Sequence, residues 1–282
     1  MKNRILYALP TMKCNLHCPH CFIKDTPETF DREKFLSVLN NFEGSIVMFG
    51  GEVTSNLDRF YDIYESNMID GKSKIASVSS NLIVLNDKLI SIYKSINSVS
   101  TSWNALRFTD AQYELWKSNC KRLSCNGIRH RIMVTLTEDL LEWDVEAFLD
   151  KAKEWITTTL RDIKFEHYVG DSTSPEYFER VDKWLCELYS KWNIPTKMEI
   201  SERVLNWSYD CSEIYTLYPD GTVKNECPHA SARYTPIECF ECSRVETCRP
   251  CRLQKYCSYP KRFAELVKAD NKHLEVDHES CI

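Results

Sequence analysis

The distribution of cysteine limits what this chain can fold into more than any other feature. Of its 14 cysteines, three stand close together near the amino terminus and eight fall between Cys211 and Cys281. The first residues lack the apolar stretch and small-residue cleavage site of a secretory signal. Cysteines in a chain without such a signal are metal ligands more often than disulfides. We therefore expect two metal-bearing regions in a cytoplasmic protein.

Composition and charge restrict the class of protein further. The 282 residues are 43% hydrophobic and 27% charged, as in an ordinary folded protein. No apolar run approaches the roughly 18 residues that a membrane helix needs, so we expect no membrane partner. The net charge is −5 and no long basic run occurs, so we expect no nucleic-acid partner either.

Short apolar runs alternate with longer segments of helical periodicity from Ile5 onward, which is typical of βα units around a parallel sheet. Six such units are predicted. The expected strands are Ile5–Leu9, Ser45–Phe49, Lys74–Ser79, Ser98–Trp103, Arg129–Leu136 and Asp162–His167. The expected helices are Arg32–Asn41, Leu57–Asn67, Asp87–Ser95, Asp110–Leu123, Val145–Trp155 and Pro175–Trp192.

The amino-terminal cysteines form a C-x3-C-x2-C triplet, Cys14, Cys18 and Cys21, in the loop after the first expected strand. Three thiolates on one loop can hold three irons of a 4Fe-4S cube and leave the fourth iron open. This motif resembles that of the radical S-adenosylmethionine (SAM) superfamily. In that family SAM chelates the open iron and is cleaved to a 5′-deoxyadenosyl radical, which takes hydrogen from substrate. The alternative is a zinc knuckle with His17 or His20 as the fourth ligand.

The ends of the next three strands extend this resemblance. Phe49 is followed by a Gly-Gly-Glu motif, in which glycine lets the backbone come close to the methionine part of SAM. The family usually has proline where this chain has Val53. Polar segments after the third and fourth strands correspond to family segments that contact SAM, with Asn104 in place of an acid. The SAM-binding residues that the resemblance implies are Gly50, Gly51, Glu52, Ser80, Asn81, Ser102 and Asn104.

The carboxyl-terminal cysteines resemble a SPASM domain, the auxiliary-cluster module of many peptide-modifying radical SAM enzymes. The resemblance includes a strand–turn–strand segment with the turn Pro219-Asp220-Gly221. Two residues separate Cys248 from the next cysteine, where the SPASM pattern has three. The cysteines therefore align with the pattern in two registers, and which of them share a cluster stays open. Eight cysteines are what two fully ligated 4Fe-4S clusters require, although one cluster or zinc ribbons also fit. The implied ligands are Cys211, Cys227, Cys239, Cys242, Cys248, Cys251, Cys257 and Cys281.

The sequence therefore predicts an α/β fold in two parts. A partial (β/α)6 TIM barrel is expected over residues 1–205, followed by a SPASM-like domain over residues 206–282. Glu166 and His167 end the sixth expected strand and are the candidate acid and base. Cys120, Cys125 and Cys186 lie in or beside expected helices, where buried packing is expected.

The resemblance implies an enzyme that modifies a ribosomally made peptide, by cross-linking, thioether formation, epimerisation or oxidation. Its electrons would come from a reductant such as flavodoxin or ferredoxin. Only 13 residues precede Cys14, so we expect any leader-recognition protein to be separate. Two alternatives stay open: modification of a small molecule such as a nucleoside, sugar or amino acid, and a non-catalytic iron-sulfur electron carrier.

Overall fold

A computed structural model describes residues 4–21, 23, 27–96, 98–167, 175–200, 213–225 and 266. Within these residues nine strands form one sheet in the order β11-β10-β1-β2-β5-β6-β7-β8-β9. Neighbouring strands are parallel except β10 and β11, which form an antiparallel hairpin. The strands are β1 (Ile5–Ala8), β2 (Ser45–Met48), β5 (Ile75–Ser79), β6 (Ser98–Trp103), β7 (His130–Leu136), β8 (Leu160–His167), β9 (Lys197–Ile200), β10 (Ile214–Leu217) and β11 (Val223–Lys224).

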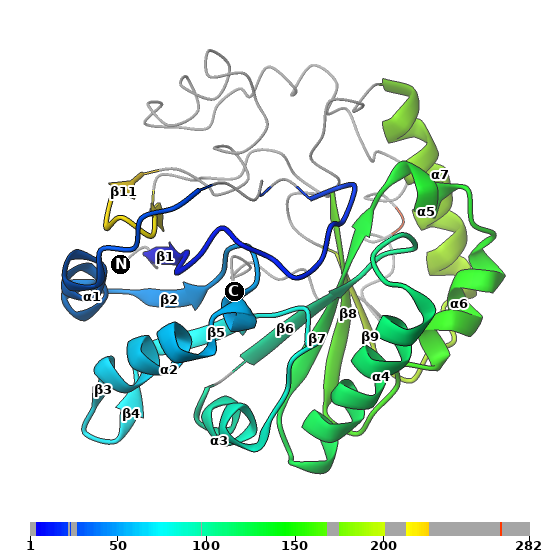
Figure 1. The fold of residues 1–282 in the computed structure, drawn as a ribbon. Helices are drawn as coiled ribbons and strands as arrows, with labels where there is room; N and C mark the ends of the chain where they lie inside the picture. The colour runs from blue at the N-terminus through cyan, green and yellow to red at the C-terminus, as the bar shows by residue number, and fades with distance from the viewer. Residues whose placement is uncertain are drawn as a thin grey trace.

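Helices connect successive parallel strands and lie along one side of the sheet (Figure 1). Most begin at a side chain that accepts a hydrogen bond from a free amide of the first turn, as Asp31 and Asn86 do. Thr109 forms a reciprocal capping box with Gln112. The helices are α1 (Arg32–Asn41), α2 (Leu57–Ser66), α3 (Asp87–Ser95), α4 (Asp110–Cys125), α5 (Glu138–Leu141), α6 (Val145–Lys153) and α7 (Pro175–Lys191), with a 3-10 turn η1 (Val53–Ser55).

This architecture confirms the predicted partial (β/α)6 barrel, and each of the six expected strands and helices lies within two residues of its predicted bounds. Five short elements were not predicted: β9, the helix α5, the turn η1, and the hairpin of β3 (Met68–Ile69) with β4 (Lys72–Ser73). These elements have two to four residues each, too few to show a period. The expected hairpin is present, and β10 pairs with β1. The boundary near residue 205 lies outside the described residues and stays a prediction.

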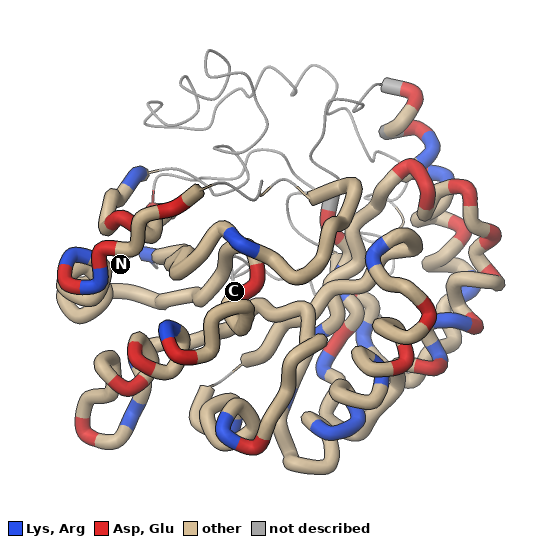
Figure 2. Tube along the Cα trace, viewed as in Figure 1, with Lys and Arg blue, Asp and Glu red and all other residues tan. Residues whose placement is uncertain are grey.

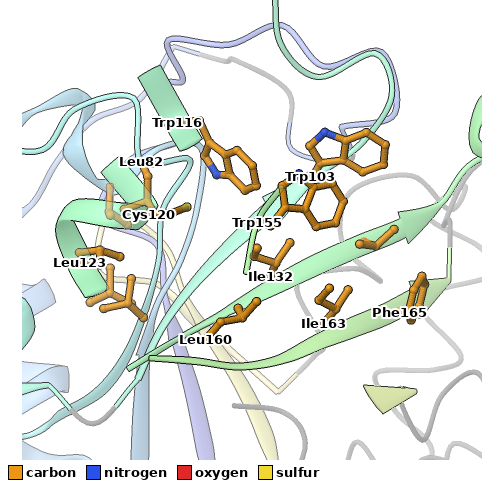
Figure 3. Close-up of a cluster of buried hydrophobic side chains, with 14 of the residues drawn as sticks. Leu82, Trp103, Trp116, Cys120, Leu123, Ile132, Trp155, Leu160, Ile163 and Phe165 are labelled. Carbon is orange, nitrogen blue, oxygen red and sulfur yellow. The ribbon is translucent and has the colours of Figure 1, made fainter. Parts of the chain in front are cut away.

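The main core lies between the sheet and the helices. Figure 3 shows Trp103 and Trp155 beside Ile132 and Ile163, which are strand residues facing the helices. The rings of Trp103 and Trp155 are 4.8 Å apart between centroids. Cys120 of α4 is buried in the same core, as predicted, and burial raises the pKa of its thiol to about 12. The expectation of buried packing was wrong for Cys125, which is exposed at the end of α4.

The outward surfaces of the helices carry charges of both signs. Figure 2 shows Lys and Arg interspersed with Asp and Glu along these helices, which is what a solvent-facing surface requires. Among the described residues, no helix combines the length and apolar character needed to cross a membrane.

The opposite face of β7, β8 and β9 carries a buried charge network. Ile163 and Phe165 pack toward the helices, so strand alternation places Asp162 and Lys164 on the other face. Arg131 of β7 donates two hydrogen bonds to Asp162, at 3.0 and 3.2 Å, and contacts Glu199 of β9 at 3.2 Å. The Lys164 ammonium is 3.7 Å from Glu199, so each buried charge faces an opposite one.

Glu199→Gln is expected to lower the free energy of unfolding by about 1–3 kcal/mol. The substitution removes a buried negative charge that faces both Arg131 and Lys164, so each of these buried cations loses an ion-pair partner. The change would be measured from urea unfolding followed by near-UV circular dichroism. Glu142→Gln is the matched control, because Glu142 pairs with Arg180 on the exposed surface and should change stability by at most about 0.5 kcal/mol. Equal effects of the two variants would contradict a stabilising role for the network.

Candidate functional site

The candidate site lies at the carboxyl ends of the strands, where β1 runs into the cysteine loop. Cys14, Cys18 and Cys21 are all half-buried on this loop, and none forms a disulfide among the described residues. The backbone amide of Cys21 donates to the carbonyl of Cys18 at 3.0 Å, which forms a tight turn between them. Leu16 is buried, and its amide donates to the Cys14 sulfur at 3.3 Å. The loop therefore holds Cys14 with its sulfur already accepting a hydrogen bond.

The two glycines after β2 bring the cysteine loop against the sheet. The amide of Gly51 donates to the carbonyl of Thr11 at 3.0 Å, and the amide of Glu52 donates to that of Lys13 at 2.7 Å. A Cβ on Gly51 would lie 2.1 Å from the Lys13 oxygen, well inside any contact distance. Gly50 has φ +135°, and its Cβ would lie 2.5 Å from the Thr11 oxygen. Glycine at these positions allows the loop to approach the end of β2.

The Glu52 carboxylate joins the ends of β2 and β5. It is 2% exposed and accepts four hydrogen bonds. Two come from the amide and hydroxyl of Thr54, at 3.0 and 2.6 Å. The others come from the Ser80 hydroxyl at 2.8 Å and the Asn81 amide at 2.6 Å. Glu52 and Ser80, both predicted to bind SAM, thus make a rigid buried connection between two strand ends.

Asn81 reaches from the end of β5 to the cysteine loop. Its side-chain amide donates to the side-chain oxygen of Asn15 at 2.6 Å and lies 4.0 Å from the Cys14 sulfur. Burial raises the pKa of the Cys14 thiol, and the Glu52 carboxylate adds to this rise. The Leu16 amide and the Arg107 guanidinium act in the opposite direction. Asn81 is therefore the polar side chain next to the Cys14 sulfur, and the charges of Glu52 and Arg107 also act on that thiol.

The other predicted SAM-binding residues lie at the end of β6. Asn104 is 2% exposed, and its side-chain amide donates to the Thr137 hydroxyl at 2.8 Å and the Thr135 carbonyl at 3.2 Å. Its side-chain oxygen accepts from the Leu106 amide. Ser102 is half-buried, two residues earlier on β6. A role in SAM binding stays a prediction for both residues.

The predicted acid and base come from the end of β8. The Glu166 carboxylate is partly exposed, and the Lys164 ammonium lies 3.9 Å from it. The side chain of His167 lies outside what the structure describes, as do all eight carboxyl-terminal cysteines predicted as cluster ligands.

The donors on the cysteine loop suit an iron-sulfur cube. Among the described residues, no three His, Cys, Asp or Glu side chains converge as the ligands of a single metal ion would. A cube is held differently, because each thiolate binds a separate iron and the sulfurs stand around the cluster. Three thiols on one loop, with the Leu16 amide directed at the Cys14 sulfur, supply such a ligand set and a hydrogen bond to it.

Comparison with solved structures finds two proteins with a similar fold. SuiB of Streptococcus suis bound to S-adenosylmethionine matches over 83% of this chain and 62% of SuiB, with a TM-score of 0.57 and 14% identity. The anSMEcpe structure with bound AdoMet matches over 95% of this chain and 86% of its own, with a TM-score of 0.60 and 14% identity. This chain shares the fold of these two proteins, both solved with S-adenosylmethionine bound. No family model matches it, and no curated protein matches it in sequence.

A third match is the structure of SuiB bound to the precursor peptide SuiA, with a TM-score of 0.57 and 14% identity over 95% of this chain and 67% of SuiB. The chain therefore spans about two thirds of the length of SuiB in these matches. At this identity the likeness concerns the fold alone.

The sequence analysis missed three charged residues near the cysteine loop. Arg107, just after β6, contributes a positive charge beside Cys14, and its Nε atom is buried without a hydrogen-bond partner among the described residues. Glu28 and Arg59 form a partly buried ion pair at the base of the cysteine loop. None lies within a recognisable motif, and lone charged residues carry no local signal of their position in space.

Proposed function

We propose that this chain is a radical SAM enzyme that modifies a ribosomally made peptide. The observation that carries the proposal is the packing of the cysteine loop on Gly50 and Gly51, at the carboxyl-end edge of a parallel sheet where such folds place their sites. Asn81 and Arg107 supply a hydrogen-bond donor and a positive charge beside Cys14.

Cys14, Cys18 and Cys21 would hold a 4Fe-4S cluster, and SAM would bind at its remaining iron. When bound, this cluster would supply the electron that cleaves SAM to methionine and a 5′-deoxyadenosyl radical. Arg107 would pair with the SAM carboxylate, since its buried Nε atom has no hydrogen-bond partner among the described residues and its charge acts on Cys14. Gly50, Gly51 and Glu52 would position the cysteine loop, and Ser80 and Asn81 would hold that edge of the site rigid. Ser102 and Asn104 would lie toward the ribose.

The carboxyl-terminal cysteines would hold auxiliary clusters in a SPASM-like domain over residues 206–282. Eight cysteines suffice for two such clusters, from Cys211 to Cys281. These clusters would take up the electron left on the product radical or position the substrate. A flavodoxin or ferredoxin would deliver electrons to the amino-terminal cluster.

The peptide substrate is supported by the likeness to SuiB, which has been solved with its precursor peptide SuiA. Glu166 and Lys164 lie near the end of β8 on the same face of the sheet, as residues two apart on a strand do. Glu166 would accept or return a proton on the substrate, with His167 beside it in sequence. A separate leader-recognition protein would present the peptide.

The test uses the full chain reconstituted anaerobically with iron and sulfide, then reduced with dithionite in the presence of SAM. The probe is a synthetic precursor encoded by a small reading frame beside the gene, deuterated on its carbon atoms. We expect deuterium in 5′-deoxyadenosine and a changed peptide mass. Cleavage of SAM with an unaltered peptide would overturn the peptide substrate and favour a small molecule. No cleavage of SAM by reconstituted protein would overturn the enzyme assignment and favour an electron carrier.

A further inference from the structure

The cysteine loop is closed at its base by a single carboxylate. Glu28 follows the triplet by seven residues, yet its side chain returns to the residues that precede the triplet. One oxygen accepts from the Thr11 hydroxyl at 2.8 Å, and the other accepts from the Met12 amide. The Glu28 side chain is 7% exposed, so these bonds are largely shielded from water.

Arg59 of α2 completes this closure from outside the loop. One of its terminal nitrogens lies 2.6 Å from the Glu28 carboxylate and donates also to the Pro10 carbonyl at 2.7 Å. Its guanidinium stacks over the Phe30 ring at 4.2 Å. Arg59 therefore contacts the chain on both sides of the cysteines and connects it to a helix of the barrel.

The contacts of this pair reach Cys14 through a short stretch of backbone. Met12, which donates to Glu28, is two residues from Cys14, and the Thr11 and Lys13 carbonyls accept from the amides that follow Gly50. The segment before the first cysteine is thus held on one side by Glu28 and on the other by the sheet. Loss of the first contact would free the segment to shift while the sheet contact remains.

We infer that Glu28 and Arg59 are positioning residues that fix the placement of the cysteine loop, and through it the place where SAM binds. This inference rests on the proposed function. Neither residue would touch SAM or the cluster. The pair would act by holding the backbone of Thr11 and Met12. The three thiols would then keep the same relative positions with and without the bound cluster.

The test compares Glu28→Gln with Asp62→Asn in the reconstituted full chain. Asp62 lies on the same helix as Arg59 and also pairs with an arginine, Arg32, at 2.6 and 2.7 Å, but on the exposed surface. Both variants exchange one carboxylate oxygen for an amide within an arginine pair. In Glu28→Gln the new NH2 group would face the Thr11 hydroxyl or the Met12 amide, which both donate to the carboxylate in the wild type. Only this variant should therefore displace the cysteine loop.

We expect Glu28→Gln to retain the iron content of the wild type and to raise the KM for SAM about tenfold or more, with a smaller change in kcat. The electron paramagnetic resonance spectrum of the reduced cluster should respond to SAM differently from that of the wild type. Amide hydrogen exchange of the peptide spanning residues 11–13 should be faster. Arg59→Lys keeps the positive charge but loses the planar stacking on Phe30. In each of these measurements it should lie between the wild type and Glu28→Gln.

Asp62→Asn should match the wild type in each of these measurements. A Glu28→Gln protein with wild-type KM, spectrum and exchange would overturn the inference while leaving the proposed function intact. A wild-type chain that shows neither a cluster signal nor a response to SAM would overturn the proposed function, and the inference with it.

Discussion

Cys18→Ala is expected to reduce SAM cleavage below detection while the chain keeps its fold. Cys18 is the middle ligand of the proposed set, and its carbonyl accepts the turn-forming hydrogen bond from Cys21. Alanine preserves this backbone contact and removes only the sulfur. A cube left with two protein ligands would have two unprotected irons, and SAM could no longer be directed to one of them. The measurement is 5′-deoxyadenosine formed with dithionite and SAM under anaerobic conditions.

Iron analysis separates the two metal-bearing regions in the same experiment. Cys18→Ala should lower bound iron by about four per chain, and iron at the carboxyl-terminal cysteines should persist. Cys125→Ala is the matched control, because Cys125 is an exposed thiol at the end of α4 with no place in either region. This control should retain both iron and SAM cleavage. SAM cleavage retained by Cys18→Ala would show that the triplet is not the site.

The barrel could be predicted from sequence because each βα unit carries its own signal. The segment Arg32–Asn41 shows helical spacing after a capping Asp31, and Ser98–Trp103 is a short run between turn-forming residues. Burial on the helix side of the sheet then follows from alternation along the strands. β9 gave no such signal, since within Lys197–Ile200 an exposed lysine and a buried Glu199 interrupt the apolar pattern.

The site was predicted only where its residues form a motif. The sequence indicated the cysteine triplet, Glu52 and Asn81, and the structure brings these together through the bonds of Glu52 to Asn81 and of Asn81 to the loop. Glu28 and Arg59 are separated by 31 residues and meet only in the folded chain. No rule of local spacing joins such a pair, so only the structure revealed it.

The structure shows contacts of the motif residues that the sequence did not predict. The approach of the Gly-Gly-Glu segment to SAM stays a prediction, and the structure shows in addition that its glycines lie against the backbone of the cysteine loop and that its glutamate bonds to Thr54 and Ser80. Two adjacent glycines indicate that something comes close to this backbone. The sequence alone does not say whether the second partner is a ligand or another part of the same chain.

Gly51→Ala is expected to lower SAM cleavage about 100-fold. The new Cβ would lie 2.1 Å from the Lys13 oxygen and 2.5 Å from the Met12 oxygen, whereas ordinary contacts begin at 3.4 Å. Both obstacles are backbone atoms, so no side chain can turn aside to make room. The segment before Cys14 must therefore move by about 1 Å, and displacements of this size at a reacting centre are costly. The measurement is the rate of 5′-deoxyadenosine formation per reconstituted cluster.

Gly71→Ala distinguishes this steric effect from the general cost of replacing a glycine. Gly71 lies between β3 and β4 with φ +76°, and a Cβ there would meet nothing within 4 Å. Alanine at this position is strained by about 1–2 kcal/mol through its backbone conformation, and it touches no part of the cysteine loop. We therefore expect Gly71→Ala to lower the unfolding midpoint with SAM cleavage unchanged, and Gly51→Ala to lose SAM cleavage with its near-UV circular dichroism retained. If Gly51→Ala cleaved SAM at the wild-type rate, the contact between Gly51 and Lys13 would have no part in placing the cysteines.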